Sequence, residues 1–64
     1  MESVAERLKS ARLEKGETVG VCAKLCGINS SALRNYEAGL RIPRDDIKVK
    51  LAQHLGKSIE DLFF

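Results

Sequence analysis

The sequence has no long apolar run, although 44% of its 64 residues are hydrophobic. A membrane-spanning helix needs about 20 consecutive apolar residues, so we expect no membrane span. The N-terminus also lacks the pattern of a secretory signal peptide, because Glu2 and Glu6 interrupt it and no apolar segment follows. We therefore expect one cytoplasmic domain over residues 1–64, at the small end of what folds alone.

The sequence also lacks a strongly basic tail. Eleven Lys and Arg residues stand against nine Asp and Glu residues, so the formal net charge is only +2. A strongly basic segment would indicate nonspecific binding to nucleic acid, and that class of protein is not favoured. If the chain binds DNA, its positive charge must be concentrated on one face.

Cysteine is scarce, with Cys22 and Cys26 as the only two. On a helix, residues four apart share a face. A disulfide there would be strained across a helical turn, and the expected compartment is reducing. A zinc site needs about four ligands, and His54 is the only further nitrogen or sulfur ligand. We therefore expect two small buried core residues, and no metal or cofactor.

The sequence offers little to an enzyme. Its single histidine, His54, lies between Leu51 and Leu55 and has no nucleophile or carboxylate at a useful spacing. A chain of 64 residues also leaves little room for a pocket of catalytic size. We expect a partly exposed helix histidine and no catalytic activity.

Residues 18–36, TVGVCAKLCGINSSALRNY, carry the pattern of two short helices joined by a tight turn. Thr18 can cap a helix over residues 19–26, and Gly27 can adopt the left-handed conformation that ends it. Asn29 can then cap a second helix over residues 30–37. This arrangement is a helix-turn-helix unit, and in its DNA-binding form the second helix enters the major groove.

The rest of the chain also predicts helices. Residues 3–15 have helical apolar spacing and a capping-box signal at Ser3 and Glu6. A further helix is expected from about residue 44 until Gly56, with a last short turn after Ser58. Five short helices and no strand indicate an all-α fold. The expected core contains Val4, Leu8, Cys22, Leu33, Leu51, Leu55 and Leu62.

Over residues 4–63 the chain resembles the phage-repressor and Cro-like (XRE-type) helix-turn-helix family of bacterial and phage transcription regulators. The resemblance implies a compact five-helix, lambda-repressor-like domain, with the helix-turn-helix unit at about residues 18–37. Its spacings hold without insertion over nearly the whole chain. The landmarks are Arg7, Leu8, Arg12, Lys15, Gly16, Thr18, Ala23, Gly27, Ile28, Leu33, Tyr36, Glu37, Gly39, Arg41, Pro43, Leu51, Ala52, Leu55, Gly56, Ser58, Ile59, Glu60, Asp61 and Leu62.

The resemblance assigns DNA base contacts to the outer face of the third helix, at Ser30, Ser31, Arg34 and Asn35. Arg can bond two acceptors of guanine, Asn both edges of adenine, and Ser either a donor or an acceptor. The alternative is a plain solvated polar face. The stretch from Asn29 to Asn35 contains no carboxylate, which favours a phosphate-rich partner.

The resemblance also implies DNA phosphate contacts. The backbone N–H groups near Thr18 and Val19, at the start of the second helix, can bind a phosphate. Arg41 and Arg44 can bind the same strand. Tyr36 either donates its hydroxyl to a phosphate or packs against the core.

Two further pairs have a structural interpretation. In such folds an arginine of the first helix pairs with a glutamate at the end of the recognition helix, here Arg12 and Glu37. Phe63 and Phe64 are a candidate dimer contact; alternatively, one packs on its own core and the other frays.

Some positions depart from the family pattern. Val19 stands where many members have Gln, Gly20 lies inside a helix, and Glu17 and Asp45 replace apolar residues. These changes leave the fold prediction intact but indicate weaker DNA binding.

The resemblance favours a nucleoid-associated transcription regulator that binds double-stranded DNA. We expect a repressor that binds an inverted-repeat operator as a homodimer. The alternative is a protein-interaction module, of the antitoxin or anti-repressor type, that keeps the fold with weak or no DNA binding.

Overall fold

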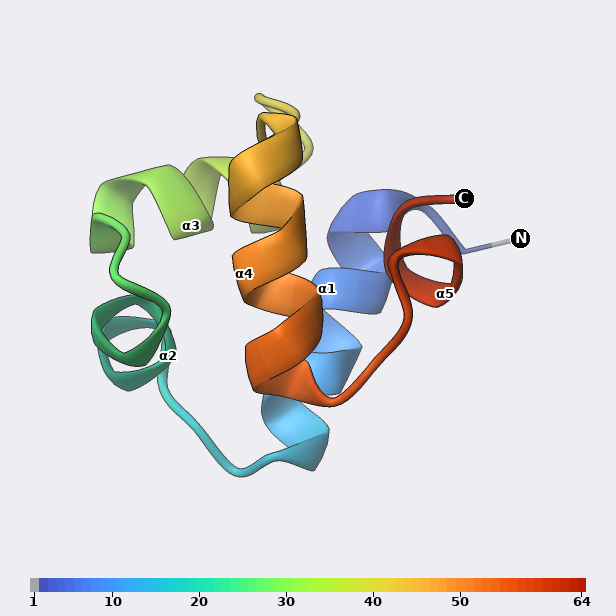
Figure 1. Ribbon diagram of the computed structural model, residues 1–64. Helices are drawn as coiled ribbons and strands as arrows, with labels where there is room; N and C mark the ends of the chain where they lie inside the picture. The colour runs from blue at the N-terminus through green and yellow to red at the C-terminus, as the bar shows by residue number, and fades with distance from the viewer. Residues whose placement is uncertain (1) are drawn as a thin grey trace.

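The computed structural model describes residues 2–64, and in this part of the chain it contains five α-helices and no strand. Each helix lies within one or two residues of its predicted bounds, so the all-α fold is confirmed. None of these helices is long and apolar enough to cross a membrane. The helices, shown in Figure 1, are α1 (Val4–Glu14), α2 (Val19–Cys26), α3 (Ser30–Glu37), α4 (Asp45–Leu55) and α5 (Ile59–Phe63).

Side-chain caps explain why most of the helices begin where they do. The residues that precede α1, α2, α3 and α5 each accept a hydrogen bond from a free N–H group of the first turn. These caps are Ser3, Thr18, Asn29 and Ser58. Helix α4 has no such cap, but Asp45 and Asp46 place negative charge in its first turn, where the helix dipole favours it.

The turn between α2 and α3 depends on Gly27. Its φ of 72° is left-handed, a conformation that costs a residue with a Cβ more than it costs glycine. The chain reverses there, and the Ile28 N–H donates to the Ala23 carbonyl at 2.9 Å, which satisfies one of the last carbonyls of α2. The turn therefore fixes the angle between the two helices of the predicted helix-turn-helix unit.

The helices pack around one apolar core. In Figure 1, α2 and α3 lie on one side of α4, and α5 lies on the other. Helix α1 packs against α3 and α5, and α2 packs against α3 and α4. Of the predicted core residues only Val4 is half-buried, and the rest are buried. The core contains Leu8, Ala11, Cys22, Ala23, Cys26, Leu33, Tyr36, Ile47, Leu51, Ala52, Leu55, Leu62 and Phe63.

The two C-terminal phenylalanines differ in burial. Phe63 is 8% exposed and packs in the core, whereas Phe64 is 78% exposed. Of this predicted dimer contact, only Phe64 offers surface to another chain. Leu40 and Ile42, in the connector between α3 and α4, are also exposed.

Candidate nucleic-acid interface

Helix α3 has a buried face and a polar outer face. Leu33 and Tyr36 are buried against the core. Of the four predicted base contacts, Ser31 and Arg34 are exposed, and Ser30 and Asn35 are half-buried. The structure therefore leaves the predicted reading face of α3 open, with no carboxylate on its first two turns.

The predicted ion pair between Arg12 and Glu37 is present and nearly buried. Arg12 Nε donates to Glu37 Oε2 at 2.8 Å, and Arg12 Nη2 donates to Glu37 Oε1 at 3.0 Å. The two side chains are only 9% and 8% exposed. The hydrogen bond to Glu37 raises the pKa of Arg12 above its usual value, so the guanidinium is always charged.

The same guanidinium donates a third hydrogen bond. Arg12 Nη1 donates to the Glu17 carbonyl at 2.7 Å, just before the start of α2. One side chain of α1 therefore holds both the end of α3 and the entry to α2. This arrangement fixes the helix-turn-helix unit on the rest of the fold.

Basic residues of the α3–α4 connector and of α4 lie beside α3. Arg41 and Arg44 are exposed, and with Lys50 they line a shallow groove of about 520 Å³ between the α2–α3 turn and the start of α4. Tyr36 also lines this groove, but it is only 8% exposed. Of its two predicted roles, phosphate contact and packing against the core, the structure shows the packing. Lys50 was not predicted, because its spacing along α4 resembles that of any exposed helix lysine.

The start of α2 is open to solvent at Thr18, and Val19 is half-buried. The Thr18 hydroxyl accepts from the Val21 N–H at 3.2 Å. Because the first N–H groups of a helix have no partner within it, those of Val19 and Gly20 remain for another acceptor. This end of α2 therefore has the chemistry of an anion site.

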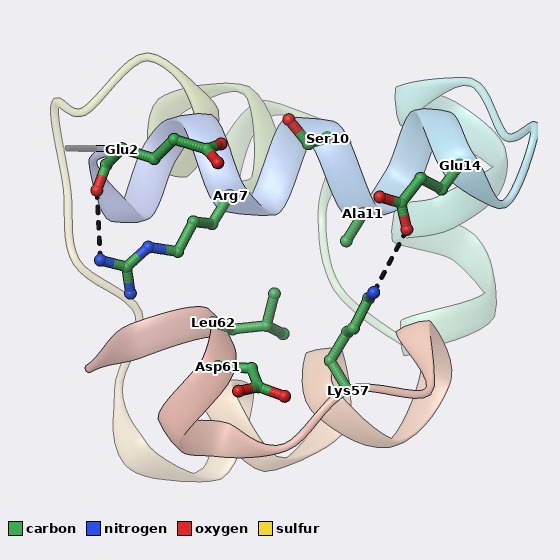
Figure 2. A pocket seen from close by; sticks show the side chains of 8 residues that line it. All are labelled: Glu2, Arg7, Ser10, Ala11, Glu14, Lys57, Asp61 and Leu62. Atoms are coloured by element: carbon green, nitrogen blue, oxygen red, sulfur yellow. Dashed lines mark hydrogen bonds and ion pairs between the residues drawn. The ribbon is translucent and has the colours of Figure 1, made fainter.

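A hollow between α1 and α5, shown in Figure 2, lies apart from these residues. Its volume is about 220 Å³, and it carries both signs of charge. Arg7 donates to the Glu2 carbonyl at 3.1 Å, and Lys57 lies 3.2 Å from Glu14. Arg7 thus bonds to a backbone carbonyl and Lys57 pairs with a carboxylate, and no residue of α2 or α3 lines the hollow.

One polar contact was missed by sequence reasoning. His54 Nε2 lies 2.7 Å from Glu17 Oε1, and both side chains are mostly buried. The hydrogen bond to His54 lowers the pKa of Glu17. No local pattern relates the two residues, so only the packing of α4 beside the α1–α2 loop reveals the pair. The sequence places no carboxylate near His54, but the fold brings Glu17 next to it.

The cysteines are buried core residues, as predicted. Burial raises the pKa of the Cys22 thiol to about 12 and also raises that of Cys26. The two sulfur atoms and a ring nitrogen of His54 lie within 4.8 Å of one another. Among residues 2–64, this is the one group of side chains with the spacing and chemistry to hold a metal ion.

Comparison with known proteins agrees with this geometry. A family model described as helix-turn-helix matches residues 8–62, which include all of α2, α3 and α4. No curated protein and no solved structure matches the chain significantly. The function of the family is DNA-binding transcription regulation, and it is generally not enzymatic. The chain therefore belongs to the helix-turn-helix family of the Cro and phage-repressor (XRE) type.

Proposed function

We propose that this regulator is a repressor that binds an inverted-repeat operator in double-stranded DNA as a homodimer. The observation that carries the proposal is the outer face of α3, which is polar and open while the Arg12–Glu37 pair holds the helix in place. A rigid helix with free polar side chains can enter the major groove without losing its position on the domain.

The base contacts in this proposal are Ser30, Ser31, Arg34 and Asn35. Arg34 has the longest reach and is exposed, so it is the residue that recognises guanine. The two serines stand at the start of α3, and Asn35 lies one turn further along. These contacts specify sequence, whereas phosphate contacts set the position of the domain on the duplex.

The phosphate contacts come from two sides of α3. The N–H groups of Val19 and Gly20, beside the Thr18 cap, bind one phosphate at the start of α2. Arg41 and Arg44 bind the backbone on the other side, where they line the groove. Each phosphate neutralised by such a cation releases counterions, so DNA binding weakens steeply as salt rises.

The homodimer rests on exposed apolar side chains near the C-terminus and the α3–α4 connector. Leu40, Ile42 and Phe64 are each more than two-thirds exposed, at 74%, 79% and 78%. A second copy can cover such residues. Two copies related by a twofold axis would place their α3 helices about 34 Å apart, one turn of DNA.

The test is fluorescence anisotropy of a labelled duplex from the region upstream of the chain's own gene, titrated at two salt concentrations. We expect binding that outcompetes random duplex, falls steeply with salt, and saturates at two chains per duplex. Salt-insensitive or absent binding to every duplex would contradict the proposal. That result would favour a protein-interaction module, for which the low net charge of +2 is the supporting observation.

A further inference from the structure

The packing of α2 against α4 brings together three side chains with soft or borderline metal-binding atoms. Cys22 and Cys26 lie one turn apart on the inner face of α2, and His54 lies in the last turn of α4. Their two sulfur atoms and one ring nitrogen lie within 4.8 Å of one another. Both cysteines are buried, and the side chain of His54 is only 16% exposed.

We propose that Cys22, Cys26 and His54 bind one Zn²⁺ ion. In tetrahedral sites the Zn–S distance is about 2.3 Å and the Zn–N distance about 2.0–2.1 Å, so neighbouring donor atoms stand roughly 3.4–3.8 Å apart. The present separations, at most 4.8 Å, need to close by about 1 Å. Small side-chain rotations achieve this closure, because both cysteines already lie on the same helix face.

The charges of the ligands favour binding of Zn²⁺ at this site. Binding forms two Zn–S bonds and one Zn–N bond, and the two thiol protons pass to solvent. The two thiolates then balance the two positive charges of the ion, so these ligands bury no net charge. Thiolate and imidazole together suit zinc, whereas Mg²⁺ and Ca²⁺ prefer oxygen ligands.

Glu17 supports the site from outside the three ligands. Its carboxylate lies 2.7 Å from His54 Nε2, and its side chain is 11% exposed. A carboxylate in contact with a ligating histidine orients the ring and increases its basicity. A water molecule can take the fourth position on the ion, as in zinc sites with three protein ligands. This supporting role accounts for the burial of the Glu17 side chain near the two cysteines.

A disulfide explains fewer of these observations. It would use both sulfur atoms but neither His54 nor Glu17. The zinc site uses all four side chains, and it joins α2, the first helix of the helix-turn-helix unit, to α4. The proposal does not depend on the operator or on repression.

The experiment uses the full chain, reduced and metal-free, under anaerobic conditions. We titrate it with Co²⁺ and then with Zn²⁺. We expect one Co²⁺ per chain, with the thiolate charge-transfer band and the visible bands of a tetrahedral site, and displacement of Co²⁺ by Zn²⁺. Zn²⁺ should also raise the melting temperature, because it binds the folded state.

Variants identify the ligands. His54→Gln and Cys26→Ser should each abolish the tetrahedral spectrum, and Gln53→Ala, an exposed neighbour on α4, should retain it. Cys22 is fully buried, so its substitution is avoided. If Cys26→Ser fails to fold by circular dichroism, His54→Gln at a half-buried position still tests the site.

The supporting role of Glu17 has its own test. Glu17→Gln should weaken zinc binding about 10- to 100-fold, as the loss of an outer carboxylate does elsewhere. No thiolate charge-transfer band in the folded, reduced protein would overturn the proposal. A spectrum and zinc affinity that survive His54→Gln unchanged would also overturn it, since binding would then need the two thiols alone.

Discussion

Helices α2 and α3 are both eight residues long, but they meet the rest of the molecule in opposite ways. Helix α2 has an apolar inner face, and it also exposes Val21 and Leu25 to solvent. Helix α3 exposes a polar face and is held at its far end by the Arg12–Glu37 pair. The comparison shows that α2 is held mainly by packing of its inner face, with Arg12 contacting only the backbone before it, whereas α3 also has a charged contact at one end.

The largest loss of stability should come from Glu37→Ala, which removes the charged contact at the end of α3. It leaves the Arg12 guanidinium nearly buried without its carboxylate, and such a loss costs about 3–5 kcal/mol. We expect the free energy of unfolding, measured by urea denaturation, to fall by about that amount. Glu60→Ala, an exposed control in α5, should stay within about 0.5 kcal/mol of the wild type. Equal midpoints of urea denaturation for Glu37→Ala and Glu60→Ala would show that the Arg12–Glu37 pair does not hold α3.

The caps of the two helices form a matched pair. Thr18→Ala removes the acceptor for the Val21 N–H, and Asn29→Ala removes the acceptor for the Ser31 N–H, which lies 2.7 Å from Asn29 Oδ1. Each should lower the stability by about 1 kcal/mol, as the loss of an N-cap does. Thermal melting monitored by circular dichroism measures both. An unchanged melting temperature in either variant would mean that packing alone sets the start of that helix.

Gly20→Ala should stabilise α2. The position lies inside the helix, its φ is not left-handed, and an added Cβ meets no atom within 4 Å. Alanine then gains its helix propensity without a clash, about 0.5–1 kcal/mol. The melting temperature should rise, and Gly27→Ala, at a left-handed position, should lower it as the contrasting control. A lower melting temperature for Gly20→Ala would contradict this account of position 20.

The smallest effect on stability, and a large one on binding, should come from Arg34→Ala. Arg34 is exposed, so the free energy of unfolding should change by less than about 0.5 kcal/mol. Loss of a bidentate base contact should weaken operator binding about tenfold or more and relax the preference at one base pair. Lys57→Ala, which also removes one cation but lies at the α1–α5 hollow, is the control for net charge. Equal anisotropy titrations for both variants would remove Arg34 from the interface.

Local sequence patterns were enough to predict the helices. Caps such as Ser3 and Asn29 act on N–H groups two or three residues away, so the sequence itself contains both partners. The Arg12–Glu37 pair is long-range and was predicted only through the resemblance to a family. The base and phosphate contacts rest on the same resemblance, and they remain predictions.

The contacts that sequence could not predict are those made by packing. Glu17 and His54 belong to no shared pattern, and the cysteines gain a third potential ligand only when α4 lies beside α2. The C-terminal phenylalanines were ambiguous for another reason. Helix α5 has five residues, too short a segment for periodicity to show which ring faces the core.

The separation of the two faces of α3 has a consequence for how such regulators diversify. The residues that fold the helix, Leu33 and Glu37, have buried or nearly buried side chains, whereas Ser31 and Arg34 are exposed. Substitutions at these outer positions should be nearly neutral for folding. Under the proposed function, a lineage could therefore change its operator one base pair at a time without passing through an unfolded intermediate. Grafting the outer residues of another family member onto this α3 should transfer that member's preference and leave the stability unchanged.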